Sequence, residues 1–174
     1  MRLAAIGFLV GAMSIGPAMA ADAPDPLSGC TDLKNIPPGA RIDTCKSLLA
    51  AGTLTQDQTH TALHGLGVAY AQQGDFTFAI DTFTTALASY PDDSQEYLSR
   101  GAAYLASGRN DLGLADYDKA VALQPKHSYL MRATAYYVLH KYALAVADCD
   151  AELRLVPDDA DAKKLRDKAQ AHVN

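Results

Sequence analysis

The sequence predicts an all-α protein built from three repeated helix pairs. Alanine is abundant, tryptophan is absent and runs of β-branched residues are few, which favours helix over strand. Three similar blocks each place a proline 21 residues after a tyrosine, and the prolines are separated by 34 and 32 residues. A period of this length is typical of stacked helix–turn–helix units. The pairs are Tyr70 and Pro91, Tyr104 and Pro125, and Tyr136 and Pro157.

Length and charge place the chain among single-domain globular proteins. It has 174 residues, 49% of them apolar, which suffices to bury a core. Its 15 basic residues are scattered and are outnumbered by 20 acidic ones, giving a net charge of −5. The sequence therefore has no basic patch that would attract nucleic acid.

The first twenty residues have the three parts of a secretory signal peptide. Met1 and Arg2 give a positive start, Leu3 to Ile15 are uncharged and apolar, and Ala18-Met19-Ala20 form a cleavage site. The apolar run is shorter than the roughly 20 residues of a membrane span. We expect residues 1–20 to be removed after Ala20 and the mature protein to be periplasmic or secreted, with no membrane span left. A buried N-terminal helix is the less favoured interpretation.

Cysteine usage agrees with export. Cys30 and Cys45 enclose a segment containing Pro37-Pro38-Gly39, which predicts little regular structure there. A disulfide between them is the natural staple in an oxidising compartment. A metal pair is the alternative, although no histidine lies nearby in the sequence. Cys149 lies in an Ala/Val/Leu-rich stretch and is expected to be a buried apolar residue.

Capping and turn residues predict where the other elements begin and end. Residues 21–29 contain two prolines and are expected to form a flexible lead-in, followed by a short helix from Asp43 to Ala51 that ends at Gly52. Thr55 and Gln58 have the spacing of a capping box at the start of a long helix. A last helix is expected from Asp161 to Val173. Gly74 and Gly108 occupy matching turns, where the third unit has His140.

Small residues recur on the second helix of each unit, four positions before a larger one. This spacing places both on one helix face and lets antiparallel helices approach closely. The pairs are Ala79 and Phe83, Gly113 and Tyr117, and Ala145 and Cys149.

The period and the pattern of Gly, Tyr, Ala, aromatic and Pro positions resemble the tetratricopeptide repeat. The resemblance implies a right-handed solenoid of three helix–turn–helix repeats, with a C-terminal capping helix that covers the last apolar face. Gly113, Cys149 and Glu152 depart from the family pattern, which suggests a looser last repeat. The expected division is a signal peptide (1–20), an N-terminal segment (21–59), repeats at 60–93, 94–125 and 126–159, and the capping helix (160–174).

The resemblance also implies a concave surface lined by the first helix of each repeat. Carried over to this chain, the lining positions that we expect to bind a partner are His64, Val68, Leu98, Ala102, Leu105, His127, Leu130, Thr134 and Tyr137. The remaining lining positions are Thr61, Ala71 and Gln95.

The chemistry of these positions predicts the kind of partner. Leu98, Leu105, Leu130 and Tyr137 among small residues favour an apolar or amphipathic segment of another protein. The Lys/Asn/Arg clamp with which some family members hold a C-terminal carboxylate is missing. Its matching positions here are His64, Val68, Ser99, His127 and Met131.

Several alternatives accompany this interpretation. In one of them the N-terminal segment covers the groove. In another a second copy of the chain covers it, and the protein is then a self-associating structural subunit. Arg100 and Arg132, with aspartates recurring on the second helices, are expected to form Arg–Asp pairs between helices, a phosphate or carboxylate site being less favoured. His60 and His64, spaced i,i+4, share a helix face that suits a metal, and His127 is the candidate third ligand across the groove. A metal-binding protein is the less favoured alternative, because no glutamate follows His60 in the protease manner. The sequence shows no catalytic constellation or phosphate loop, so we expect a non-enzymatic protein without metal or other cofactors.

Overall fold

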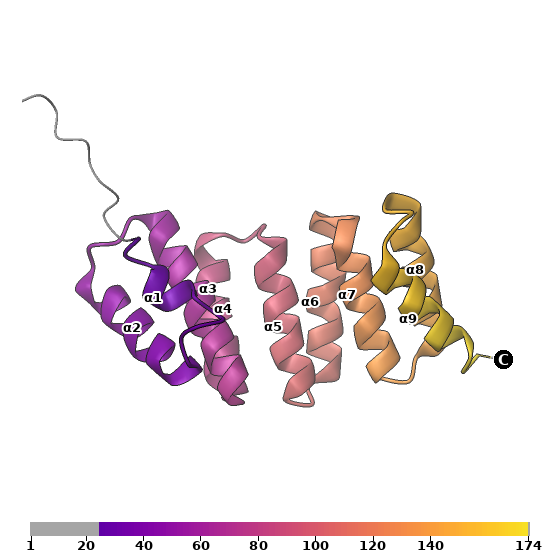
Figure 1. Cartoon of the computed structure of the whole chain (residues 1–174), viewed down its shortest axis with the longest axis horizontal. Helices are drawn as coiled ribbons and strands as arrows, with labels where there is room; N and C mark the ends of the chain where they lie inside the picture. The colour runs from indigo at the N-terminus through magenta and orange to yellow at the C-terminus, as the bar shows by residue number, and fades with distance from the viewer. Residues whose placement is uncertain (1–24, 174) are drawn as a thin grey trace, which may run out of the picture.

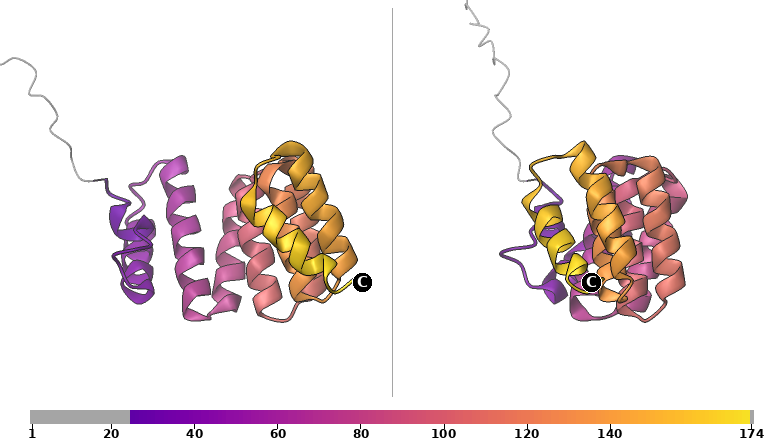
Figure 2. Two further views of the ribbon diagram at one scale, coloured as in Figure 1. Left: turned by 45° about the vertical axis from the view of Figure 1, so that its right-hand side comes forward. Right: turned by 90° about the vertical axis from the view of Figure 1, so that its right-hand side faces the viewer.

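The computed structural model describes residues 25–173, which form a curved array of helices (Figure 1, Figure 2). No strand occurs within this range. The predicted signal peptide and residues 21–24 lie outside the described residues. The helices are α1 (Ser28–Thr31), α2 (Pro38–Ala51), α3 (Gln56–Gln73), α4 (Phe76–Ser89), α5 (Ser94–Ala106), α6 (Asn110–Leu123), α7 (Pro125–Val138), α8 (Tyr142–Leu155) and α9 (Ala160–Gln170).

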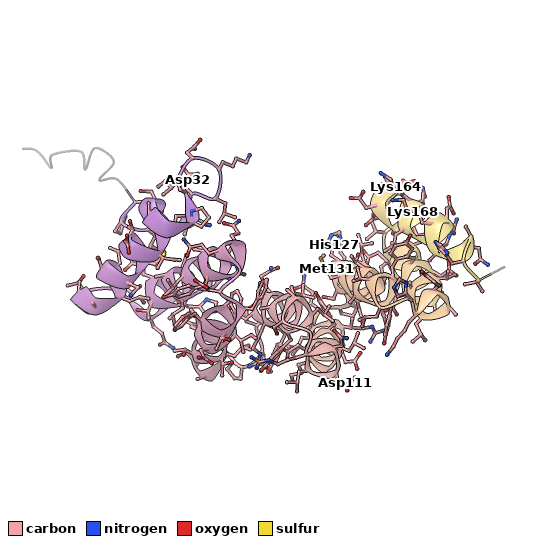
Figure 3. The ribbon with its side chains drawn as sticks, turned by 90° about the horizontal axis from the view of Figure 1, so that it is seen from below. Asp32, Asp111, His127, Met131, Lys164 and Lys168 are labelled. Atoms are coloured by element: carbon pink, nitrogen blue, oxygen red, sulfur yellow. A yellow bond between two sulfur atoms is a disulfide. The ribbon has the colours of Figure 1, made fainter. Side chains whose placement is uncertain are left out.

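The helices pack in sequential antiparallel pairs. Helices α3 and α4, α5 and α6, and α7 and α8 make the three pairs, and α9 packs on α8 and α7. The array bends into an arc, with His127 and Met131 on its inner side and Asp111 on its outer side (Figure 3). The all-α repeat architecture is therefore confirmed.

The N-terminal segment is more ordered than the sequence suggested. Helix α2 begins at Pro38 and not at Asp43, because proline at the first helical position costs no hydrogen bond and already has a helical φ. Leu27 is 7% exposed and packs in a core cluster with both segment cysteines, so the expected flexible lead-in is wrong for residues 25–29. The expected end of α2 is confirmed, since Gly52 adopts a left-handed φ of 64°.

Helix starts and turns follow the local sequence signals. The capping box at the start of α3 is confirmed, with Thr55 and Gln58 bonding reciprocally. Gly74 and Gly108 turn with φ of 86° and 79°. His140 adopts φ 58° at the matching turn, a conformation that costs a residue with a Cβ more than it costs glycine.

Glycines let the paired helices approach closely. A Cβ on Gly67 would lie 2.5 Å from the ring of Phe83. Gly101 and Gly113 face each other, and a Cβ on Gly113 would lie 2.8 Å from the Gly101 carbonyl oxygen and 2.9 Å from the Leu105 side chain. The departure at Gly113 thus permits a tight contact between α5 and α6.

The departure at Glu152 has a different physical basis. The backbone is non-helical at Lys126 and His127, so regular helix begins at Ser128. Glu152 is fully buried, and the His127 backbone N–H donates to both of its carboxylate oxygens, at 3.0 and 2.9 Å. The charged side chain therefore holds the start of α7, which is a defined junction and not a loosened one.

Cys30 and Cys45 lie side by side with their Cα atoms 5.1 Å apart, and both are fully buried. This separation is in the range that a disulfide spans. Cys149 is also fully buried, and burial raises the pKa of its thiol to about 11.

These environments predict a thiol count for the mature protein. We expect no thiol to react with Ellman's reagent at pH 8 in the native state, because the Cys149 thiol stays protonated and buried. One thiol should react after denaturation, and three after denaturation with reduction. Three reactive thiols in the denatured, unreduced protein would contradict the disulfide. Reduction is expected to lower the free energy of unfolding by about 3 kcal/mol, the chain-entropy value for a 15-residue loop.

Candidate partner-binding groove

An apolar trough runs along the inner side of the array between α5 and α7. It consists of two adjoining hollows of about 300 and 280 Å³, which share Ala102 and the floor residue Tyr117. We call it the α5–α7 trough. Its lining residues are Gln95, Leu98, Ser99, Ala102, Leu105, Ala106, Tyr117, His127, Met131, Thr134, Ala135 and Val138.

The structure brings five of the nine predicted groove residues into this trough. They are Leu98, Ala102, Leu105, His127 and Thr134. Leu130 and Tyr137 do not line it. Their neighbours in sequence, Met131 and Val138, take that place and expose 42% and 64% of their surface.

Helix geometry explains this exchange. Successive residues on an α-helix are rotated by about 100°, so two faces of α7 serve two neighbouring helices. Met131 and Val138 face α5. The ring of Tyr137 instead contacts two rings at the C-terminal end: Tyr142 on α8, with centroids 5.5 Å apart, and His172, which follows α9 in the chain, at 6.1 Å. The predicted contribution of Tyr137 is thus directed toward the C-terminal end of the array.

The first helix pair presents a polar hollow in place of an apolar one. This hollow of about 180 Å³ lies between α3 and α5. His64 lines it and pairs with Glu96 (Nδ1 to Oε1, 2.7 Å), a hydrogen bond that raises the pKa of His64. Val68 packs against the buried cluster around Phe83. The inner surface therefore changes from polar at α3 to apolar at α7. The lining residues are His60, Thr61, His64, Asp93, Gln95 and Glu96.

Arg–Asp pairs tie the helices together, as the sequence predicted. Arg100 donates from Nε and Nη2 to Asp116, both at 2.8 Å, and Arg132 makes the same two bonds to Asp148 at 2.7 and 2.8 Å. These bonds and the adjacent carboxylates raise the pKa of both arginines. Neither guanidinium is free to bind a phosphate.

Each of these arginines also reaches back to the preceding repeat. Arg100 donates from Nη1 to Thr84 on α4 at 3.1 Å, and Arg132 from Nη1 to Asp118 on α6 at 2.7 Å. Arg166 on α9 lies 3.6 Å from Asp150 on α8, which continues the series. We call the bonds of Arg100, Arg132 and Arg166 to the preceding helices the polar ladder. It links each repeat to the next and the last repeat to α9.

Tyr117, on α6, lines both hollows, as does Ala102 on α5. Tyr117 is 6% exposed, and this burial raises the pKa of its phenol to about 12. No residue in the described range accepts a hydrogen bond from its hydroxyl. The floor of a mostly apolar trough therefore carries a neutral hydrogen-bond donor.

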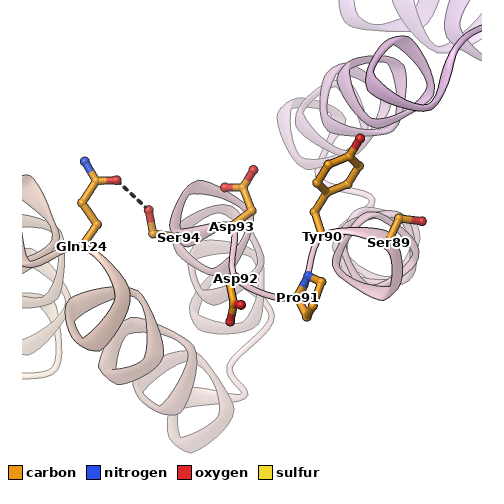
Figure 4. Close-up of a pocket in the computed structure, with 7 residues that line it drawn as sticks. All are labelled: Ser89, Tyr90, Pro91, Asp92, Asp93, Ser94 and Gln124. Carbon is orange, nitrogen blue, oxygen red and sulfur yellow. Dashed lines mark hydrogen bonds between the residues drawn. The ribbon is translucent and has the colours of Figure 1, made fainter.

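A further hollow lies at the edge of the array, away from the trough. It measures about 490 Å³ and is formed by the turns at Ser89–Ser94 and by Gln124, whose Oε1 accepts a hydrogen bond from Ser94 at 3.0 Å (Figure 4). Its lining mixes the side chains of Tyr90 and Pro91 with polar residues from the turns, and none of the predicted groove residues lines it.

Comparison with known proteins identifies the repeats. The sequence profile described as tetratricopeptide repeat matches residues 46–94 and 64–128. The chain is a tetratricopeptide repeat protein. Tetratricopeptide repeats are non-enzymatic protein-interaction modules, and this chain belongs to that class.

Relatives of this tetratricopeptide repeat protein agree on the fold. Superkiller protein 3 of Saccharomyces cerevisiae is 31% identical over 64 residues, 37% of this chain but only 4% of the yeast protein. The first repeat domain of Spaghetti (RPAP3), solved with an HSP90 peptide SRMEEVD, is 26% identical with a TM-score of 0.59, covering 67% of this chain and 94% of that one. A thermophilic repeat protein of Thermus thermophilus matches at 20% identity and TM-score 0.67, covering 77% of this chain and 73% of that one.

Three features of this repeat protein escaped the sequence interpretation. Val138 was not predicted, and Met131 entered only as a position of the missing carboxylate clamp, because the family positions name a single face of each first helix. Tyr117 was assigned to packing alone. The close contact of Gly101 and Gly113 between α5 and α6 could have indicated that Tyr117, four residues after Gly113, lies at the floor of the trough. Asp93 and Glu96 were not connected with the histidines of α3, because 29 or more residues separate them in sequence.

Proposed function

We propose that the protein holds an apolar or amphipathic segment of a partner protein in the α5–α7 trough, within an envelope or secretion assembly of the periplasm. The observation that carries this proposal is the exposure of Met131 and Val138 opposite Leu98 and Leu105 in one continuous trough. Apolar side chains concentrated at the centre of a concave surface are the usual anchors of a protein interface.

The chemistry of the inner surface favours such a segment over an acidic tail. The HSP90 peptide seen with Spaghetti (RPAP3) ends in acidic residues. Here the trough contains no lysine or arginine, and the chain carries a net charge of −5. An acidic peptide would therefore meet neither a cation in the trough nor a favourable overall field.

The export part of the proposal rests on the sequence. A signal peptide cut after Ala20 delivers the chain to a compartment in which Cys30 and Cys45 can oxidise. No helix in the described part of the chain has the length and apolarity to cross a membrane. N-terminal sequencing of protein from a periplasmic fraction should begin at Ala21; an intact Met1 in the cytoplasmic fraction would overturn this part.

Site-specific crosslinking tests the binding surface. A photoreactive residue replaces Leu98 in the trough, and the control replaces Leu112, an α6 residue that is 50% exposed and does not line the trough. We expect one foreign protein to be captured from Leu98 and not from Leu112. The same adducts from both positions would contradict the assignment of the trough.

Self-association through the same surface is the second candidate. It is favoured by the same exposed side chains, since a second copy would cover Met131 and Val138. Adducts from Leu98 only to the protein itself, together with a concentration-dependent sedimentation coefficient, would replace the foreign partner by this alternative.

The floor of the trough gives a finer prediction. Changing Tyr117→Phe removes only the hydroxyl, and we expect the melting temperature to stay unchanged because no described residue bonds to it. Partner affinity should fall by about 1 kcal/mol, roughly fivefold, because the partner loses a hydrogen-bond donor. Calorimetric titration of the captured segment measures this; unchanged affinity would show that the hydroxyl is not used.

A further inference from the structure

The polar hollow between α3 and α5 holds a group of metal-ligating side chains that the α5–α7 trough does not use. We propose that His60, Asp93 and Glu96 bind a divalent transition-metal ion of the zinc class, and that His64 positions Glu96 for it. The proposal goes beyond the partner-binding function, and neither depends on the other.

Two helix starts bring these side chains together. His60 lies one turn before His64 on α3, so both point from the same face. Asp93 caps α5 and accepts from the backbone N–H groups of Gln95 and Glu96 through Oδ1. Its second oxygen, Oδ2, thereby remains directed at His60.

The distances suit a metal ion better than hydrogen bonds. His60 Nε2 lies 3.5 Å from Asp93 Oδ2 and 3.5 Å from Glu96 Oε1. Ligands about 2.0–2.1 Å from a tetrahedral ion are separated from one another by about 3.3 Å. One ligand atom from each of the three residues lies within 4.8 Å of the others.

Two buried polar atoms in this group have no hydrogen-bond partner within the described range. They are Nε2 of His60 and Oε2 of Glu96, whose side chain is only 1% exposed. Burial of an uncompensated carboxylate oxygen is costly. Oε2 belongs to the same carboxylate whose Oε1 lies 3.5 Å from His60 Nε2, so a cation held through both oxygens of Glu96 would remove the cost. This orphaned oxygen is the observation that distinguishes the group from an ordinary surface cluster of charges.

The surroundings provide the supports that ligands of a metal usually have. His64 Nδ1 is 2.7 Å from Glu96 Oε1 and fixes the carboxylate. The ring of Tyr90 packs on the ring of His60 with centroids 4.3 Å apart, and its hydroxyl donates to Asp57. Three protein ligands beside a hollow leave a position for water or for a side chain of a partner.

The types of the three ligands narrow the choice of metal ion that the site would bind. An imidazole nitrogen with two carboxylates suits zinc and its neighbours in the transition series, whereas calcium and magnesium prefer ligand sets made of oxygen alone.

A second group, consisting of His127, Glu152 and Asp159, provides an internal contrast. Both carboxylate oxygens of Glu152 already accept from the His127 backbone N–H. Unlike Glu96, Glu152 has no oxygen without a partner in the described range, so we expect this group not to hold an ion. Substitution of its histidine is therefore a matched control.

Zinc titration of the chelator-treated mature protein, without an affinity tag, tests the site. We expect one Zn²⁺ per chain, a zinc-dependent rise in melting temperature, and visible d–d absorption of tetrahedral Co²⁺ in the same site. His60→Ala should abolish all three, and Asp93→Asn, which keeps an oxygen for the helix cap, should weaken zinc affinity strongly. His64→Gln should lower the affinity by roughly 10- to 100-fold, as expected for a positioning residue. His127→Asn should leave the zinc stoichiometry, the zinc-dependent rise in melting temperature and the Co²⁺ absorption as in the wild type.

Circular dichroism of the apo variants separates loss of the site from loss of the fold. Folded wild-type protein that binds no Zn²⁺, or folded His60→Ala that binds it with unchanged affinity, would overturn the proposal. Failure of zinc binding with intact crosslinking at Leu98 would leave the trough function standing.

Discussion

Changing Leu98→Asp is expected to abolish partner capture without unfolding the protein. The substitution places a carboxylate among Ala102, Met131 and other apolar side chains that the partner would bury. A buried, unpaired charge costs more than the roughly 2 kcal/mol that defines a binding hot spot, so affinity should fall by at least about 30-fold. Leu98 is only half-buried in the free protein, so helicity by circular dichroism should be retained.

The matched control for this experiment is Leu112→Asp. It introduces the same charge at an apolar residue that is exposed on α6, outside the trough. Calorimetric titration of the captured segment should show wild-type affinity for Leu112→Asp. Equal losses in both variants would mean that charge, and not the trough, controls binding.

Changing Arg132→Met is expected to lower the stability of the protein strongly. The arginine side chain is 17% exposed and pairs with Asp148, which is 9% exposed. No other cation within residues 25–173 bonds to Asp148, so the substitution would leave this carboxylate unpaired. Removing one partner of a mostly buried ion pair costs about 3 kcal/mol. For a domain of this size, the melting temperature should fall by about 10 °C.

Arg154→Met is the control for the ion-pair variant. Arg154 is exposed and makes no ion pair within the described range, so its loss should change the free energy of unfolding by less than about 0.5 kcal/mol. Denaturant titration measures both variants. An equally small change for Arg132→Met would show that the polar ladder does not hold the repeats together.

Repetition made the architecture predictable. The capping box at Thr55, the turn glycines and the Arg–Asp pairs all depend on local or near-local spacing, and the structure contains each of them. A signal that recurs three times in phase is much harder to obtain by chance than a single motif. The same repetition, through the family resemblance, also predicts a concave surface lined by the first helices.

The details that were missed depend on distances that sequence does not contain. Tyr137 and Val138 are neighbours in the chain, but a rotation of about 100° sends one toward α8 and the C-terminal end and the other toward α5. Glu96 meets His64 only because α3 and α5 are adjacent first helices of two repeats. The start of α2 at Pro38, by contrast, follows a local signal that the sequence does contain, because proline is favoured at the first helical position.

Binding of the partner by the α5–α7 trough can be followed by methyl NMR of the mature protein, titrated with the segment captured by crosslinking. We expect shifts confined to the methyl groups of Leu98, Leu105, Met131 and Val138. Shifts at the exposed Leu112, Leu144 and Leu155, with the trough methyls unmoved, would contradict binding by the trough.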